Sequence, residues 1–357
     1  MRKILKPGIH YLYLFIPITL ALEYSHASAP MIFFSAALSI IPIARLISTS
    51  TEHLATYTGD AVGGLLNATF GNFPELIIAI IALKAGLHEM VLASLVGAIL
   101  ANLLMATGMS FFLGGLKYRN QEYNPVSTRV YSSMMMIAVI SLTVPSAFHR
   151  VAEQLPSGNE NKLNIYLSIV LLIGYILYLV FMLKTHKDFF KSHAAEEEHH
   201  NRWSIQRAII SLIVASVLAA FMSEVLVGAA EETGKVLGLS SAFIGLIFLA
   251  IVGGAAESIS AILMGRKNKM DLSLGIALGS SIQIAIFIAP LLVILSLFVG
   301  PGQMNLSFPR GLIVALFASV VIAGMISGDG RSNWYKGVQL LIIYVIIAML
   351  LYFGTTG

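Results

Sequence analysis

The sequence contains no cysteine and very little charge. Only 11% of its 357 residues are Asp, Glu, Lys or Arg, and 57% are hydrophobic, whereas an average soluble domain carries roughly 25% charged residues. The lack of charge excludes a soluble globular protein, and the lack of cysteine leaves no disulfide or thiolate ligand to consider. The net charge of +4 predicts no nucleic-acid partner, because in a membrane protein the placement of Lys and Arg matters more than their sum.

Long apolar runs separate the few charged segments. A helix needs about 20 residues to cross the hydrocarbon core, and helices are expected because lipid offers no partner for an unpaired backbone group. We interpret the first run as a retained span, since it lacks a clear signal-peptide cleavage site. Eleven spans are predicted, at residues 9–25, 29–48, 61–84, 89–114, 130–147, 163–183, 206–230, 239–264, 271–299, 310–327 and 334–354.

The basic residues predict an orientation. When the loops are assigned alternately to the two sides, 17 of the 22 Lys and Arg fall on the side of the N-terminus. The positive-inside rule then places the N-terminus in the cytoplasm and the C-terminus outside. A short chain of this kind suits the cytoplasmic membrane of a prokaryote.

The sequence repeats itself at an offset of 182 residues. GNFPELIIAI at 71–80 aligns with GGAAESISAI at 253–262, which pairs Glu75 with Glu257, and the same offset pairs Gly97 with Gly279. Because Glu75 and Glu257 are five predicted spans apart, an odd number, the two copies have opposite orientations. Inverted repeats of this kind are typical of secondary transporters.

The predicted fold is therefore an all-α polytopic membrane protein. It consists of an N-terminal transmembrane helix (1–28), two inverted five-helix repeats (29–183 and 206–357) and a cytoplasmic linker (184–205). The linker contains Glu196, Glu197, Glu198, His199 and His200. It is interpreted either as a solvated connection or as a regulatory segment that senses Ca²⁺ or pH.

Glu75 and Glu257 suit a cation. A charge near the bilayer centre costs at least about 2.5 to 3.5 kcal/mol on insertion scales, so both glutamates need compensation from a bound cation or proton. A salt bridge within the motif spans is not available, because neither contains Lys or Arg except Lys84 at the far end of the first. Two neighbouring carboxylates repel each other, so proton uptake competes with metal binding, and the same pair can exchange Ca²⁺ for H⁺.

The residues around the glutamates suit oxygen coordination. Gly71, Asn72, Pro74, Gly253 and Gly254 should break the helices and free backbone carbonyls, and Ca²⁺ takes six to eight oxygen ligands. Such an oxygen-rich site disfavours Zn²⁺ and Cu⁺. Further candidate ligands, each of which could instead be a hydrogen-bond partner in helix packing, are Asn72, Asn102, Ser280, Ser281 and Gln283.

At these residues the chain resembles the cation/Ca²⁺ exchanger superfamily, and most closely its Ca²⁺/H⁺ antiporter family. The resemblance covers nearly the whole chain after the first span and rests on LLNATFGNFPELIIAI, VLASLVGAILANLLMATGMSFFLGGLKYRNQEYN, IVGGAAESISAI and KNKMDLSLGIALGSSIQIAIF. It implies eleven spans, an acidic central loop, Glu75 and Glu257 as shared carriers of Ca²⁺ and protons, and Asn102 and Gln283 as their polar partners.

Several positions depart from the family's usual motif, Gly-Asn-Ala-x-Glu, in which His follows the second Glu. Phe73 and Pro74 occupy the middle of the first copy, Gly254 stands where Asn is usual, and Ser258 where His is usual. The Phe-Pro-Glu sequence is also similar to the Pro-Glu of Na⁺/Ca²⁺ exchangers. A Na⁺-coupled Ca²⁺ exchanger is therefore the alternative function.

Two other classes fit less well. A cation channel could use intramembrane glutamates, but one glutamate in each inverted half favours alternating access. An intramembrane enzyme is not expected, because Gly59-Asp60 and Gly328-Asp329 lie at span ends or loops and His88-Glu89 lacks a second metal-binding His. The expected partners are Ca²⁺, H⁺ and the lipid bilayer, with no resident cofactor, and homo-oligomer formation stays open.

Overall fold

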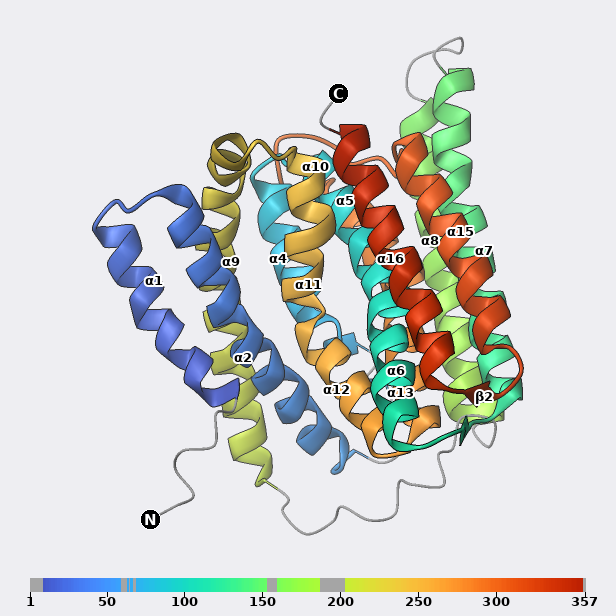
Figure 1. Ribbon diagram of the computed structural model, residues 1–357. Coiled ribbons are helices and arrows are strands. Elements are labelled where there is room, and N and C mark those ends of the chain that lie inside the picture. The colour runs from blue at the N-terminus through green and yellow to red at the C-terminus, as the bar shows by residue number, and fades with distance from the viewer. Residues whose placement is uncertain are drawn as a thin grey trace, which may run out of the picture.

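The computed structural model describes residues 9–58, 63, 65–66, 69–152, 159–186 and 203–355. Most of the predicted linker, with its three glutamates and two histidines, lies outside the described residues, as does Gly59-Asp60. The rest is a bundle of long, roughly upright helices (Figure 1). The only strands in the described part form one short antiparallel ribbon.

The first half of the chain supplies the helices drawn from blue to green in Figure 1. Three of its short helices are irregular: η1 is a 3₁₀ helix, and η2 and η3 are π-helical. The elements are η1 (Ile9–Leu14), α1 (Phe15–Tyr24), α2 (Ala29–Ala55), α4 (Phe73–Lys84), α5 (His88–Leu100), η2 (Ala101–Ala106), α6 (Thr107–Lys117), β1 (Gln121–Glu122), α7 (Pro125–Ala152), α8 (Asn159–Val180) and η3 (Phe181–Thr185).

The second half supplies the helices drawn from yellow to red, with two further π-helical segments, η5 and η6. Its elements are α9 (Ile205–Leu237), α10 (Ser241–Phe243), η5 (Ile244–Leu249), α11 (Ala250–Gly253), α12 (Ala255–Arg266), α13 (Met270–Gln283), η6 (Ile284–Ile288), α14 (Ala289–Leu295), α15 (Arg310–Ser327), β2 (Arg331–Ser332) and α16 (Trp334–Thr355).

The helices confirm an all-helical membrane protein. Eight described helices are long and apolar enough to cross a membrane, and nine if Ser241–Gly253 and Ala255–Arg266, which meet at a bend of 59°, form one span. Two of the eleven predicted spans are not among these nine. The first corresponds to the shorter apolar helix Ile9–Tyr24, and the third to α4 together with the described helical residues 63, 65–66 and 69–70 that precede it. The number eleven therefore stays a prediction.

Burial separates central from peripheral helices. The span His88–Lys117 has 94% of its most apolar window buried inside the protein, and Met270–Leu295 has 67%, whereas Trp334–Gly354 has 22%. Exposed aliphatic side chains on α8, α9 and α16 thus face outward, as expected for helices in contact with lipid. The helices that follow the two glutamate motifs form the centre of the bundle.

The predicted end of the second span was wrong. We expected this span to end at residue 48, but α2 continues to Ala55. The polar residues after 48 stay helical because some bond back to the helix: the Thr51 hydroxyl donates to the Ile47 carbonyl at 2.9 Å, and Thr51 is fully buried. Arg45 therefore lies well inside the helix and not close to its end.

The motif helices have matching bounds. Adding 182 to the limits of α4 (Phe73–Lys84) gives those of α12 (Ala255–Arg266), and α5 and α13 begin at equivalent residues, His88 and Met270. Each of these second helices continues into a π-helical segment, η2 or η6. Such π-segments are rare and often occur at functional sites.

Loops from both halves meet at one end of the bundle. Gln121 pairs with Ser332 in the β1–β2 ribbon, and its Nε2 donates to the Gly265 carbonyl and to Asn268 Oδ1, both at 2.9 Å. The Gln121 side chain therefore ties the loop after α6 to the loop after α12. At this end the predicted cytoplasmic loops of the two halves lie together (Figure 1).

Candidate cation site

Glu75 lies in the first turn of α4, at the third residue of the helix. Gly71 and Asn72 form the preceding turn, and Pro74 can occupy the first turn because the missing N–H has no partner there in any case. The Glu75 side chain is only 8% exposed, and neither carboxylate oxygen has a hydrogen-bond partner among the described residues. A buried, unpaired carboxylate is costly unless it binds a proton or a cation.

Glu257 occupies the equivalent position in α12. It is the third residue of this helix, after the break at Gly254, and is 7% exposed. Its Oε1 accepts a hydrogen bond of 3.3 Å from the Ser48 hydroxyl, while Oε2 has no partner in the described part of the chain. Both glutamates thus lie where free backbone N–H groups at a helix N-terminus favour negative charge.

The two motif segments pack directly against each other. A Cβ atom at Gly253 would lie 2.9 Å from Cγ of Glu75, and one at Gly254 would lie 3.6 Å from its Oε1. Glu75 also acts electrostatically on Glu257. The structure therefore brings together Glu75, Glu257 and Gly253, which the sequence placed in one site.

Asn72 and Gln283 join the two halves beside Glu75. The Asn72 amide nitrogen donates a hydrogen bond to Gln283 Oε1, and Gln283 Nε2 donates to the Tyr175 hydroxyl at 3.0 Å. The Asn72 side chain is 2% exposed, yet its Oδ1 has no partner among the described residues. Asn72 occupies the N-cap position of α4, three residues before Glu75, and its side chain makes no capping hydrogen bond, so this oxygen can serve a cation at the glutamate.

Asn102 and Ser258 make a second link between the halves. Asn102 lies in the π-helical segment η2, and its Oδ1 is 3.5 Å from the Ser258 hydroxyl, at the outer limit of a hydrogen bond. Ser258, which replaces the family's usual His, directly follows Glu257. Asn102 of the first half therefore contacts the second motif beside Glu257, just as Gln283 of the second half contacts the first motif at Asn72.

Ser281 is also buried, but its described hydrogen bond stays within its own helix. Its hydroxyl donates to the Ala277 carbonyl at 2.9 Å, and its side chain is fully buried. Serine commonly bonds in this way inside helices. The described contacts therefore do not join Ser281 to the glutamates.

Two residues near Glu257, Ser48 and Arg45, were not among the predicted site residues, because nothing in the sequence links this part of α2 to the second motif. Ser48 bonds Glu257, and Arg45 Nη1 donates to the Ser260 hydroxyl at 2.8 Å. Ser260 is three residues after Glu257 and so lies near it on the surface of α12. A half-buried cation thus stands one helical turn from the carboxylate, on the neighbouring helix α2.

Two of the dipeptides considered for enzymatic chemistry, Gly328-Asp329 and His88-Glu89, lie at helix ends in the described part of the chain. Asp329 lies between α15 and α16, where Lys336 Nζ contacts its Oδ2 at 2.6 Å. Partial burial tends to raise the pKa of Asp329, but hydrogen bonds from Lys336 and from the Arg331 backbone outweigh this, so its pKa is below the usual value. His88 and Glu89 form the start of α5.

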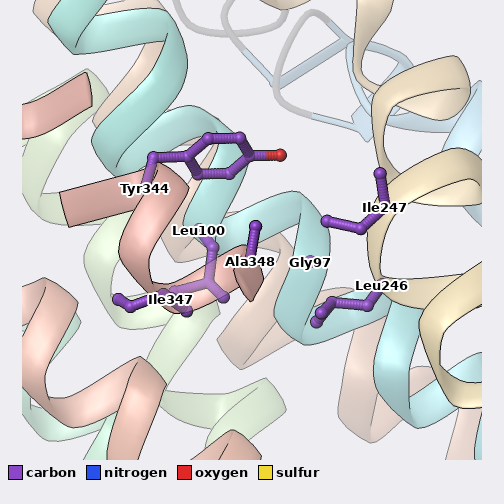
Figure 2. Close-up of a pocket in the computed structure, with 7 residues that line it drawn as sticks. All are labelled: Gly97, Leu100, Leu246, Ile247, Tyr344, Ile347 and Ala348. Carbon is purple, nitrogen blue, oxygen red and sulfur yellow. The ribbon is translucent and has the colours of Figure 1, made fainter. Parts of the chain in front are cut away.

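A small pocket between α5, η5 and α16 is a separate feature (Figure 2). The only polar side-chain group on the residues that line it is the Tyr344 hydroxyl, which has no hydrogen-bond partner among the described residues. It shares no residue with the cation site described above. The lining residues are Gly97, Leu100, Leu246, Ile247, Tyr344, Ile347 and Ala348.

Comparison with known families gives a decisive match. The sodium/calcium exchanger protein family matches residues 28–184 and 207–353, which together span most of the chain. The chain belongs to this family. Membership confirms the resemblance seen in the motifs, and also the expectation of a transporter rather than an enzyme.

Individual relatives align over almost the full chain. The Ca²⁺/H⁺ antiporter ChaA of Bacillus subtilis is 42% identical over 340 residues, 94% of this chain and 95% of the relative. A Ca²⁺/H⁺ antiporter of Aphanothece halophytica is 40% identical over 359 residues, covering 96% and 95%. The solved structure of native YfkE superposes with a TM-score of 0.84 at 38% identity, over 97% of this chain and 100% of that one.

Proposed function

We propose that the protein is a secondary active antiporter that exchanges Ca²⁺ for H⁺ by alternating access. One observation carries the proposal. The Glu75 side chain, whose buried carboxylate has no partner among the described residues, packs through Cγ on Gly253 of the second motif, so the two motifs contribute to one site. The relatives that align over almost the full chain and are named Ca²⁺/H⁺ antiporters support the choice of ions.

Glu75 and Glu257 bind either Ca²⁺ or protons in this proposal. With Ca²⁺ bound, the two carboxylates neutralise its charge, and further oxygens come from Asn72 and from the backbone of Gly71 and Gly253 beside the helix breaks. Asn102 and Gln283 hold the neighbouring segments in place through Ser258 and Asn72. Without Ca²⁺, protons neutralise the glutamates, because two unpaired buried charges are unfavourable together.

The architecture that we propose has eleven spans: an N-terminal helix and two inverted five-helix repeats, 29–183 and 206–357, joined by the linker 184–205. The matching bounds of α4 and α12, and the π-helical segments η2 and η6 that follow the next helices, support the repeat. In inverted repeats the equivalent segments meet near the bilayer midplane. Asn102 and Gln283 each lie near the middle of a long span, as this arrangement requires.

The orientation follows from the same architecture. We place the N-terminus and the β1–β2 end in the cytoplasm of a prokaryote and the C-terminus outside. The described chain starts at one end of the bundle and finishes at the other (Figure 1), as an odd number of crossings requires. The loop at the β1–β2 end carries Arg266, Lys267 and Lys269. Outward Ca²⁺ transport driven by proton entry is the proposed direction.

Ca²⁺ uptake into proteoliposomes tests this function. Purified protein is reconstituted without Na⁺, a pH gradient is imposed, and Ca²⁺ uptake is followed together with the internal pH. We expect uptake that requires the pH gradient and opposite movement of protons. The same vesicles with equal pH on both sides serve as the control.

A Na⁺-coupled exchanger is the second candidate, because the Pro74-Glu75 pair is similar to that of Na⁺/Ca²⁺ exchangers. It predicts uptake driven by a Na⁺ gradient and indifferent to pH, and this result would overturn proton coupling. Passive Ca²⁺ flux that needs no counter-gradient would overturn the exchanger in favour of a pore.

A further inference from the structure

Three buried tyrosines lie beside the candidate cation site, on α7 and α8. Tyr131, Tyr175 and Tyr178 each expose less than a tenth of their surface. Tyr175 accepts the 3.0 Å hydrogen bond from Gln283, whose amide oxygen in turn accepts from Asn72. Since Asn72 occupies the N-cap position of the helix of Glu75, this series of phenols begins at the cation site.

The tyrosines follow one another toward the β1–β2 end of the bundle. The ring centroids of Tyr175 and Tyr178 are 6.5 Å apart, and Tyr178 lies near Tyr131 where α7 packs against α8. The Tyr131 hydroxyl lies 3.6 Å from the Cβ position of Gly275, and Asp271 is close enough to act on it electrostatically. The order from the site outward is therefore Tyr175, Tyr178, Tyr131, Asp271.

Asp271 ends this series at the surface. It lies in the first turn of α13 and is partly exposed. Its Oδ1 accepts a hydrogen bond of 2.7 Å from the backbone N–H of Asn124, which directly precedes α7. A carboxylate at the mouth of a buried polar series is a suitable group to exchange protons with bulk water.

One face of α13 leaves room along the same line. Residues at intervals of four form a continuous row on a helix. On α13 one such row runs from Asp271 to Gln283, and the residues between its members are mostly buried. A Cβ atom at Gly279 would meet nothing within 4 Å, whereas one at Gly97, its counterpart in the first repeat, would lie 1.9 Å from the Leu246 carbonyl oxygen. The row, partly exposed at every position, is Asp271, Gly275, Gly279 and Gln283.

The row spans twelve residue steps, about 18 Å at about 1.5 Å per residue. This is about half the length of a membrane-spanning helix. It leads from Gln283, near the middle of the span Met270–Leu295, to Asp271 at its start. The tyrosines and the row thus lead from the interior site to the β1–β2 end of the bundle.

We propose that Tyr175, Tyr178, Tyr131 and Asp271 form a proton route between the glutamate pair and the β1–β2 end of the protein, separate from the path of Ca²⁺. The proposal rests on the proposed exchange function. A proton released by Glu75 or Glu257 passes to water. Each phenol then accepts a proton from water on one side and gives its own to water on the other. No tyrosine becomes charged, and the Asp271 carboxylate takes up the proton and releases it to bulk water.

Phenol hydroxyls suit protons better than Ca²⁺. Ca²⁺ requires six to eight oxygen ligands, and aromatic side chains along a narrow row do not offer that number.

Two transport assays distinguish a residue of the proton route from a residue of the Ca²⁺ path. Ca²⁺/H⁺ exchange needs proton movement, whereas exchange of Ca²⁺ for isotopically labelled Ca²⁺ at equal pH on both sides needs none.

The test uses the full-length protein in proteoliposomes, with the variants Tyr131→Phe, Tyr178→Phe and Asp271→Asn. Phenylalanine keeps the ring packing, and asparagine keeps an acceptor for Asn124. We expect pH-driven Ca²⁺ uptake to fall roughly tenfold in each variant. This loss is smaller than for removal of a direct acid or base, because water can bridge the gap that the removed hydroxyl or carboxylate leaves. Ca²⁺/Ca²⁺ exchange should stay at the wild-type rate. Tyr344→Phe, at the separate pocket of Figure 2, is the matched control and should change neither flux.

Two results would overturn the route. Equal loss of both fluxes in the tyrosine variants would show that the rings serve packing or the Ca²⁺ path, and unchanged pH-driven uptake in all three variants would show that protons travel elsewhere. Failure of the exchange function looks different, because the wild-type protein would then show no pH-driven uptake at all.

Discussion

Glu75 of the first motif packs on Gly253 of the second, with Cγ of the glutamate 2.9 Å from the position that a Cβ atom would take on the glycine. A contact this short leaves no room for any side chain at residue 253. The glycine break after α11 therefore does more than interrupt a helix, because it lets a carboxylate of one half enter the other. Changes at this contact should affect transport before they affect folding.

Gly253→Ala should impair transport. The added methyl group forces the Glu75 side chain away from its position, and overpacking of this kind costs about 1 to 3 kcal/mol. We expect a strongly reduced rate of Ca²⁺ uptake, with a modest fall in melting temperature. Gly228→Ala in α9 is the matched control, since a Cβ atom there meets nothing within 4 Å. Normal uptake by Gly253→Ala would show that Glu75 tolerates displacement.

Glu75→Gln and Glu257→Gln should each abolish exchange without unfolding the protein. Each change removes a charged ligand for Ca²⁺ and a proton acceptor, so we expect uptake to fall by about 100-fold or more. Because a neutral amide is cheaper to bury than an unpaired carboxylate, the melting temperature in the absence of Ca²⁺ should stay the same or rise. Glu89→Gln changes an exposed first-turn glutamate of the neighbouring helix α5 and should transport normally.

Ca²⁺ should stabilise the protein more at high pH than at low pH. Protons and Ca²⁺ compete for the same two carboxylates, so Ca²⁺ affinity rises as pH rises. A ligand that binds only the folded state stabilises it by RT ln(1 + [L]/Kd), so the rise in melting temperature at fixed Ca²⁺ should be larger at pH 8 than at pH 6. Scanning calorimetry or a fluorescence melt measures this. A shift independent of pH would contradict proton competition.

The motif helices could be predicted from the sequence because the information is local and repeated. Glu75 and Glu257 stood out as charges in apolar runs, and the constant offset of 182 residues related them. The helix breaks beside them follow from Pro74 and Gly254, whose backbone preferences act within a few residues. The all-helical membrane fold followed from the low charge of the chain and from the length of its apolar runs.

Contacts between distant segments could not be predicted. Ser48 of α2 bonds Glu257 across 209 residues of sequence, and Tyr175 bonds Gln283 across 108 residues. Hydrogen bonds of this kind depend on how helices cross, which hydrophobic periodicity does not determine. The same limitation applies to Glu75 and Gly253, since neither motif by itself reveals which residue of the other it touches.

Two predicted ligands can now be separated by experiment. Asn72 is buried beside Glu75 with its Oδ1 unpartnered among the described residues, whereas the Ser281 hydroxyl donates to the Ala277 carbonyl of its own helix. Loss of a ligand of Ca²⁺ from Asn72→Ala should weaken apparent Ca²⁺ affinity by about tenfold, equivalent to about 1.4 kcal/mol. Ser281→Ala removes only a bond within a helix and should leave the affinity unchanged. Ca²⁺ dependence of uptake at fixed pH gradient measures both, and a larger loss from Ser281→Ala than from Asn72→Ala would move the cation from α4 toward α13.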